Sequence, residues 1–234
     1  MNYGQTLSVV DSADFDGTND YMLRGADLTG ISNSKSGILS VWCRIDVDGG
    51  GSQSIVRNNS ANPFISHWVG TDDKFRFGAD NAASTEILLL TSNSAYAAGA
   101  TWRHLLASWN LATGSGHLYV NDVEDLAAGA TLTDDTIDYD SGTDWAIGAT
   151  TGGTSKWNGC FAEFYFAPGQ YLNFSQTFNR RRFISSTGKP VWLGADGAIP
   201  TGTAPLVYQR VADGAAVATF ATNLGTGGSF SITG

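Results

Sequence analysis

The sequence has little of what a glycoside-cleaving enzyme needs. Such an enzyme places two carboxylates on either side of the bond that it breaks, yet glutamate occurs only at Glu86, Glu124 and Glu163. Pairs of aspartates that share a strand face are better explained by strand ends and loops. No Gly-x-Ser-x-Gly elbow and no phosphate-binding Gly-Lys-Ser/Thr loop occurs. The sequence therefore predicts a protein that is not an enzyme, with no catalytic residue.

Long apolar runs and clustered basic charge are also missing. The longest aliphatic run covers residues 87–90, far too few to span a bilayer. The N-terminal MNYGQTLSVV lacks the basic and apolar segments of a signal peptide, which predicts synthesis in the cytoplasm. The formal net charge is -9, and the one basic run is residues 180–182. We therefore expect no nucleic-acid partner and no membrane partner.

Cysteine is scarce, because the chain has only Cys43 and Cys160. Their spacing matches no metal motif and no redox pair. Cys43 alternates in phase with Leu39 and other apolar residues, and Cys160 has the phase of Phe164 and Phe166. The pattern predicts two reduced thiols that face an apolar core, and a disulfide between them remains the alternative.

The three histidines, His67, His104 and His117, lie on separate predicted strands. No acidic residue near them in sequence indicates a hydrolytic triad. A zinc site made of all three is formally possible. We favour a structural role, above all for His104, which belongs to a strand pattern.

Strand patterns dominate the residues that are present. GILSVWCRIDVD (37–48) alternates apolar and polar side chains with a period of two, as a half-buried strand does. Similar short runs follow, each bounded by Gly, Asn, Asp or Thr, and the chain has 29 Gly to supply tight turns. Short strands at regular spacing predict an all-β sandwich or jelly roll.

A single helix is predicted in FSQTFNRRRFI, residues 174–184. Ser175 is a plausible N-cap, Phe174 and Phe178 can share one face, and Gly188 ends the segment. Beyond it, PLVYQRV and TGGSFSITG are expected to form extended pieces separated by Gly turns.

Three segments together resemble the laminin-G-like branch of the concanavalin A-like jelly rolls. They are ADFDGTNDYMLRG (13–25), TWRHLLASWNLATGSGHLYVNDVED (101–125) and AIGATTGGTSKWNGCFAEFYFA (146–167). The sequence departs from the family pattern at Asp122, often Gly there, and at Ala162, often Asp. The resemblance implies an antiparallel jelly-roll sandwich, which we place over residues 1–170, and the predicted helix then belongs to a short helix or connector over 171–187. A Gly/Pro-rich extension over 188–234 would then pack on the sandwich or on a neighbouring subunit.

The C-terminal part carries a second resemblance. FNRRRFISSTGKPVWLGADGAIPTGTAPLVYQ and NLGTGGSFSITG are similar to extensions of tailed-bacteriophage virion structural proteins. This resemblance implies a non-enzymatic virion protein, either a capsid decoration or a component of a head or tail fibre. Its expected partners are other virion proteins and further copies of itself, as a trimer by analogy with the virion class.

An acidic segment, DDTIDYDSGTD (134–144), is the best candidate for a metal site. Calcium prefers oxygen ligands, and the segment lacks the spaced ligand set of an EF-hand. Concanavalin A-like proteins often carry a calcium ion beside their ligand loops. By that analogy Asp138, Asp140 and Asp144 are candidate calcium ligands, and a solvated acidic loop is the alternative.

Sugar binding is the alternative function. A sugar ring stacks on an exposed aromatic side chain while amides hold its hydroxyls. Trp68 lies beside His67, and Trp157 lies beside Asn158, each near the end of a predicted strand where it can face solvent. Trp68, Trp157 and Asn158 are therefore the candidate ligand-binding residues for a cell-surface glycan. A glycoside hydrolase ranks last.

Overall fold

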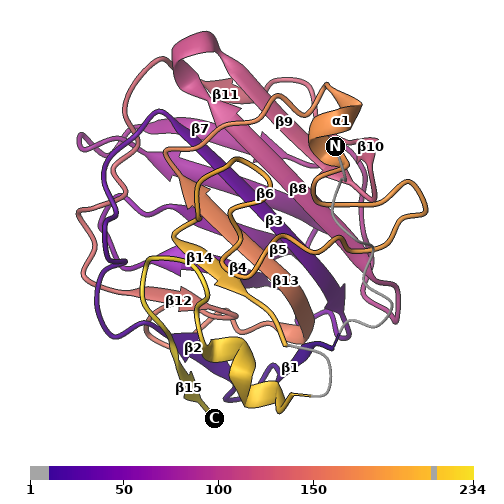
Figure 1. Ribbon diagram of the computed structural model, residues 1–234. Helices are drawn as coiled ribbons and strands as arrows, with labels where there is room; N and C mark the ends of the chain where they lie inside the picture. Colours follow the sequence, from indigo (N-terminus) through magenta and orange to yellow (C-terminus); the bar gives the residue numbers. More distant parts are fainter. Residues whose placement is uncertain (1–10, 212–214) are drawn as a thin grey trace.

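The computed structural model describes residues 11–211 and 215–234 as two antiparallel sheets packed face to face (Figure 1). The seven-stranded sheet has the order β1-β13-β3-β8-β9-β10, and β14 pairs with β13. The eight-stranded sheet has the order β11-β7-β6-β5-β4-β12-β2-β15. The architecture confirms the predicted all-β jelly-roll sandwich.

The first sheet contains β1 (Ala13–Asp16), β3 (Ser36–Ile45), β8 (Arg103–Asn110), β9 (Ser115–Val120), β10 (Val123–Glu124), β13 (Asn158–Pro168) and β14 (Val207–Gln209). The second contains β2 (Tyr21–Leu23), β4 (Ser52–Asn58), β5 (Ile65–Val69), β6 (Lys74–Asp80), β7 (Glu86–Thr91), β11 (Thr131–Leu132), β12 (Trp145–Ile147) and β15 (Ser231–Thr233). Short helices are η1 (Leu111–Thr113), α1 (Thr177–Arg180) and η2 (Val217–Ala221).

The core between the sheets follows from the period-two pattern. In β6, Phe75 and Phe77 are fully buried, while Arg76 and Gly78, which alternate with them, are partly exposed. Each buried large apolar side chain contributes roughly 1.5–3 kcal/mol relative to an exposed one. The largest buried side chains are aromatic, namely Trp68, Trp109, Trp145, Trp157, Tyr139, Tyr165, Tyr208, Phe64, Phe75, Phe77, Phe161 and Phe164.

A β-bulge interrupts β13 at Glu163. The pairing of β13 with β3 shifts register between Ala162 and Tyr165, and Glu163 has φ 46, in the left-handed region. The extra residue changes which side chains face the core. Phe161 faces inward before the bulge, and Phe164 faces inward after it.

Because of this bulge, the prediction that Cys160 faces the core is wrong. Cys43 lies in the core as expected, but Cys160 lies on the outer face and donates a hydrogen bond to Asp14 Oδ1 over 3.2 Å. The sequence pattern placed Cys160 in phase with Phe164 because an inserted residue between them cannot be seen in the alternation. Both thiols are free.

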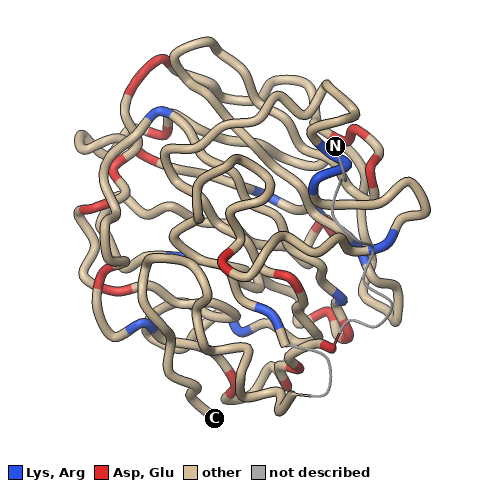
Figure 2. The backbone as a smooth tube through the Cα atoms, viewed as in Figure 1, with Lys and Arg blue, Asp and Glu red and all other residues tan. Residues whose placement is uncertain are grey.

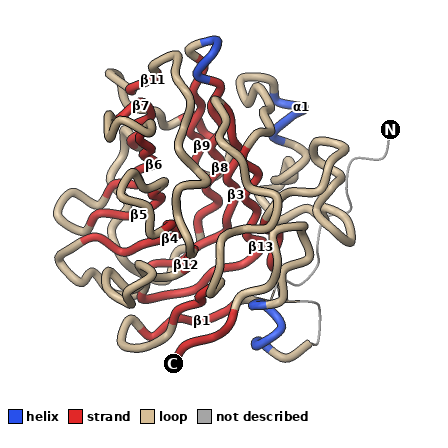
Figure 3. Tube along the Cα trace, turned by 90° about the vertical axis from the view of Figure 1, so that its left-hand side faces the viewer, coloured by secondary structure: helices blue, strands red, loops and turns tan. Residues whose placement is uncertain are grey.

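Residues of the C-terminal part form a third layer on the outer face of the seven-stranded sheet (Figure 3). Tyr165 and Leu106 on that face pack against Phe174, Phe183 and Leu193. As a result β3 is buried on both faces, as its burial pattern shows. The same part of the chain also supplies a strand to each sheet, since β14 pairs with β13 and β15 pairs with β2.

Polar contacts fix this third layer. The buried Glu163 carboxylate accepts hydrogen bonds from Tyr208 Oη and Arg210 Nε, each over 2.9 Å. At the other end of the layer, Asp122 forms ion pairs with Arg180 and Arg181, each over 2.6 Å. The basic run noted in the sequence therefore holds the layer to the sandwich.

The predicted helix over residues 174–184 is wrong in length and cap. Only Thr177–Arg180 is helical, and the N-cap is Gln176. Asn173 Oδ1 accepts hydrogen bonds from both the backbone N–H and the hydroxyl of Ser175, which draws Ser175 into a turn. Phe174 is buried, but Phe178 is 51% exposed, so the two do not share a buried face. Within the described residues no helix has the length and apolar character needed to cross a bilayer.

We predict that Arg210→Met lowers the free energy of unfolding by about 3 kcal/mol, because it leaves the buried Glu163 carboxylate without its counterion. Urea denaturation at pH 7 measures the loss, and Lys189→Met, at an exposed lysine, is the control. The double variant Glu163→Gln/Arg210→Met should recover part of the loss.

The pH dependence tests the same contact. Burial raises the pKa of Glu163 above its ordinary value, whereas Arg210 lowers it. Without Arg210 the raised pKa is less opposed, so the folded state binds a proton more readily than the unfolded state. Arg210→Met should therefore gain stability as the pH falls from 7 toward 5. Equal stability of this variant and Lys189→Met at pH 7 would contradict the account.

Candidate functional site

The two tryptophans proposed to face solvent lie in the core. Trp68 and Trp157 are both 0% exposed. Trp68 Nε1 donates to the carbonyl of Tyr96 over 3.2 Å, and Trp157 Nε1 donates to the carbonyl of Arg44 over 3.2 Å. The prediction that these rings stack on a ligand is wrong, because the partly exposed positions belong to their neighbours, His67 and Asn158.

Asn158, the third candidate, does lie at the surface. It begins β13, on the outer face of the seven-stranded sheet, directly opposite Asp16 of β1. Its Nδ2 donates to the carbonyl of Asp16 over 3.0 Å, and its own carbonyl accepts from the backbone N–H of Asp46 over 2.8 Å. Asn158 is therefore held between two carboxylate-bearing segments.

The neighbouring row of the sheet adds further polar side chains. Asp14 lies opposite Cys160, which lies opposite Arg44. The Arg44 guanidinium lies 5.8 Å from the centre of the Trp102 ring. We call the outward-facing residues at this end of the sheet the Asn158 platform, which consists of Asp14, Asp16, Arg44, Asp46, Trp102 and Asn158. Acidic segments gather around this end of the sheet, near β1 at the lower right of Figure 2.

Trp102 is the exposed ring that the sequence did not identify. It is partly exposed, and Trp192 in the third layer is 38% exposed, whereas the other five tryptophans are buried. Trp102 directly precedes β8 and points outward like His104 two residues later. The alternation in TWRHLL carried this signal, but the sequence cannot show that Trp102 also packs against Trp42, Ala162 and Ile184 and stays partly exposed.

A polar cleft of about 220 Å³ adjoins the platform. Gln53 fixes its wall, since Oε1 accepts from the backbone N–H of Asn158 and Nε2 donates to the carbonyl of Val47, each over 2.8 Å. Lys156 and Asn158 contribute polar side chains to the surface of the cleft. Its lining residues are Gly17, Val47, Gly49, Gly51, Ser52, Gln53, Ser155, Lys156 and Asn158.

The three aspartates proposed for calcium do not converge. Asp138 is buried and accepts from Asn62 Nδ2 over 3.2 Å, whereas Asp140 is exposed. Asp144 Oδ1 accepts from the backbone N–H of Gly25 and of Trp145, each over 2.8 Å. Asp138 and Asp144 organise separate loops by their hydrogen bonds, and the three carboxylates form no common cluster among the described residues, so the predicted calcium site is not formed by them.

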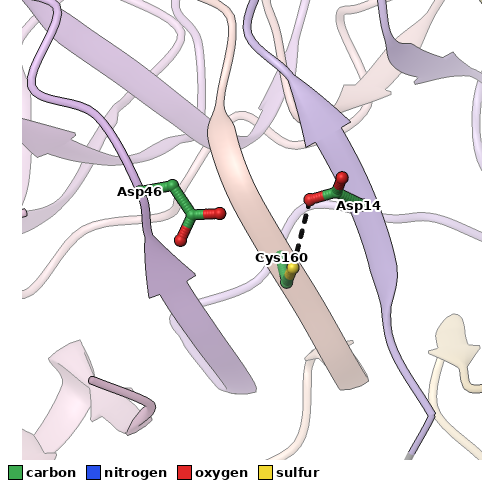
Figure 4. A group of neighbouring side chains, drawn as sticks. All are labelled: Asp14, Asp46 and Cys160. Atoms are coloured by element: carbon green, nitrogen blue, oxygen red, sulfur yellow. Dashed lines mark hydrogen bonds between the residues drawn. The ribbon is translucent and has the colours of Figure 1, made fainter. Parts of the chain in front are cut away.

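Among the described residues, a different set of three side chains does converge (Figure 4). The possible metal-ligating atoms of Asp14, Asp46 and Cys160 all lie within 4.8 Å of one another. This set fits calcium poorly. Arg44 already donates to both oxygens of Asp46, and Cys160 offers sulfur rather than oxygen. Burial, followed by the hydrogen bond to Asp14, raises the pKa of the Cys160 thiol to about 11.

The histidines have separate structural environments. His104 is buried, its Nε2 lies 2.8 Å from Ser40 Oγ, and its ring stacks on Trp42. Burial lowers the pKa of His104 to about 3, so the ring is neutral at pH 7. His117 lies 3.2 Å from the hydroxyl of Tyr171. No histidine joins a cluster of metal-ligating groups among the described residues.

We predict that Asp14→Asn makes Cys160 more reactive, because the carboxylate opposes formation of a neighbouring thiolate. In a Cys43→Ser background, the alkylation rate of Cys160 measured against pH should follow a thiol pKa near 11, and Asp14→Asn should lower that pKa. Asp16→Asn is the control, since Asp16 makes its hydrogen bonds within its own turn. An unchanged profile in Asp14→Asn would be inconsistent with the hydrogen bond.

Comparison with known proteins bears on the fold and the family. None of the curated proteins matches the chain. A suspected carbohydrate-binding protein from Bacteroides ovatus aligns with a TM-score of 0.60 at 14% identity, covering 87% of this chain and 52% of that one. This chain thus spans about half the length of that protein. The heptameric SAP-like pentraxin of Limulus polyphemus aligns with a TM-score of 0.52 at 15% identity, covering 76% and 84%.

These identities establish a shared fold and nothing finer. The family evidence comes from sequence, because the model described as the concanavalin A-like lectin/glucanases superfamily matches residues 16–169. That segment runs from the end of β1 past the end of β13, so it includes most strands of both sheets and most of the Asn158 platform. The chain belongs to the concanavalin A-like lectin/glucanases superfamily.

Proposed function

We propose that this protein binds carbohydrate, without cleaving it, on the Asn158 platform and the cleft beside it. The observation that carries the proposal is Trp102, a partly exposed ring on the same sheet face as an amide, a guanidinium and carboxylates. Membership of a superfamily that includes lectins supports it, as does the fold shared with the suspected carbohydrate-binding protein of Bacteroides ovatus.

The chemistry of the platform suits a neutral sugar chain. The apolar face of a sugar ring can stack on Trp102, while hydroxyl groups donate to the exposed carboxylates of Asp14 and Asp16. Asn158 and Lys156 supply donors at the cleft. Trp102 directly precedes β8, and Asn158 begins β13, two strands away in the sheet, so the two residues lie about 10 Å or more apart at the usual strand spacing. That separation favours an oligosaccharide over a single sugar.

The contacts of the carboxylates favour binding over hydrolysis. Asp14 and Asp46 are close enough to resemble a catalytic pair. However, Asp46 is held by two hydrogen bonds from Arg44, and Asp14 accepts from the Cys160 thiol. Because Arg44 occupies both oxygens of Asp46, this pair lacks one of the two free carboxyl groups that a glycoside hydrolase requires.

A virion role stays a prediction, since neither the superfamily match nor the shared fold bears on it. It is compatible with sugar binding, because a particle protein can also hold glycans. The C-terminal residues that carry that resemblance are those of the third layer and of β14 and β15.

We predict that Trp102→Ala and Asn158→Ala each weaken glycan binding by about tenfold or more, which corresponds to ~1.4 kcal/mol. A broad glycan array identifies the ligand, and calorimetry on the intact chain measures its affinity. Trp192→Ala removes the other exposed tryptophan and is the matched control. The proposal fails if no glycan binds, or if Trp192→Ala weakens binding as much as Trp102→Ala.

Hydrolysis is tested separately with the ligand found on the array. We expect no release of reducing ends over hours of incubation, by wild type or by Asp14→Asn. Release by wild type that disappears in Asp14→Asn would replace the binding function with a glycoside hydrolase.

A further inference from the structure

The outer face of the eight-stranded sheet carries a second set of recognition groups, on the opposite side of the sandwich from the Asn158 platform. Phe64 and Trp68 point into the core, so Ile65 and His67 point outward. The register places His67 opposite Arg76, and Ile65 opposite both Arg57 and Gly78. Arg57, Ile65, His67, Arg76 and Gly78 therefore share the outer face.

A shallow apolar floor lies beside these groups. Ile65, Gly78 and Leu89 follow one another across β5, β6 and β7. Gly78 has no side chain, and a Cβ added there would meet nothing closer than the carbonyl of Leu88 at 3.7 Å. Leu89 Cδ1 would lie 3.9 Å from the same Cβ, so Gly78 leaves a shallow step beside the Leu89 side chain. Such a low apolar row suits the apolar face of a sugar ring.

Arg57 is the unusual charge on this face. Within residues 11–211 and 215–234, its guanidinium forms no ion pair and donates no hydrogen bond, although the net charge of the chain is -9. Every other arginine is engaged by a carboxylate or by a carbonyl oxygen. These are Arg24, Arg44, Arg76, Arg103, Arg180, Arg181, Arg182 and Arg210.

His67 adds a neutral donor beside Arg57. It lies diagonally across from Arg57, a relation that places Cβ atoms about 7–8 Å apart. Its Nδ1 is enclosed without a hydrogen-bond partner. Burial first, and then Arg76 and Arg57, lower the pKa of His67 to about 4. The ring is thus neutral at pH 7, and a proton on Nε2 is free to face a ligand.

The remaining charges on this face define an orientation. Arg76 is held by Asp72 and contributes little net charge, whereas Lys74, opposite Val69, adds a positive charge on the side of Arg76 away from Asp80. Asp80 and Glu86 lie opposite each other beyond Gly78, and burial, followed by the charge of Asp80, raises the pKa of Glu86. An anionic group is therefore attracted to the end of the face at Arg57 and repelled from the end at Asp80.

We propose that this face binds an acidic sugar chain, with a carboxylate or sulfate group held between Arg57 and His67 and its ring resting on Ile65, Gly78 and Leu89. The planar Arg57 guanidinium offers the paired donors that match either anionic group. His67 Nε2 donates a further hydrogen bond. The site is independent of the Asn158 platform, because it lies on the other sheet.

The test uses the intact chain and three probes, observed by calorimetry and by the NMR signals of the His67 ring. Oligogalacturonate carries carboxylates, oligosaccharides of κ-carrageenan carry sulfate, and inorganic sulfate reports simple anion attraction. Arg57→Gln removes the charge, and Lys189→Gln is the matched control at a distant exposed lysine. Gly78→Leu fills the floor without removing any donor, and Gly78 has no left-handed backbone to strain.

We expect saturable binding of one of the two oligosaccharides, weakened at least tenfold by both Arg57→Gln and Gly78→Leu and unchanged by Lys189→Gln. The bound anion should also raise the pKa of His67, so binding should tighten as the pH falls from 7 toward 5. The oligosaccharide that binds identifies the anionic group. The proposal is overturned if neither binds, if inorganic sulfate binds as tightly, or if Arg57→Gln and Lys189→Gln behave alike. Trp102→Ala should leave this binding unchanged, so the two sites can fail separately.

Discussion

A buried carboxylate at a β-bulge determines how this molecule is organised. Glu163 is an extra residue in β13 with a left-handed backbone and 3% exposure. A charge in that position is tolerable only with a counterion and hydrogen bonds, and Arg210 and Tyr208 supply both. Because these partners belong to the C-terminal part of the chain, the bulge and the third layer require each other.

The third layer in turn decides which surfaces are open for binding. It buries the outer face of β3 and the side chains of Tyr119, Tyr165 and Tyr208 on that sheet. What remains exposed is the end of the sheet around Asn158 and Trp102, together with the outer face of the eight-stranded sheet. Both proposals about ligands concern these open surfaces. The ion pairs of Asp122 with Arg180 and Arg181 reinforce the arrangement from the opposite end of the layer.

The sequence predicted the fold because alternation and turn residues are local signals. It also placed Asn158 at a surface and Cys43 in the core. It misplaced Cys160, since one inserted residue at Glu163 reverses the phase of a strand. It misplaced Trp68 and Trp157 for a related reason: near a strand end, the pattern does not reveal which of two adjacent residues faces the core. The prediction that Asp138, Asp140 and Asp144 converge on a calcium ion was wrong, because residues close in sequence within a loop need not point their side chains to one centre.

The partners of buried charges were beyond sequence reasoning altogether. Arg210 pairs with a residue 47 positions away, and Arg180 with one 58 positions away. Only the packed third layer brings them together. The same holds for Arg57, because only the folded structure shows that its guanidinium has no partner among the described residues.

The most direct test of the account is an NMR titration of the intact protein with the best-binding neutral oligosaccharide. Signals from the seven tryptophan indoles and from the side-chain amide of Asn158 report separate surfaces. The account predicts that Trp102 and Asn158 shift together with a single saturating affinity, while Trp192 and the buried indoles stay unchanged. Saturable binding that moves Trp192, or that leaves both Trp102 and Asn158 unmoved, would contradict it.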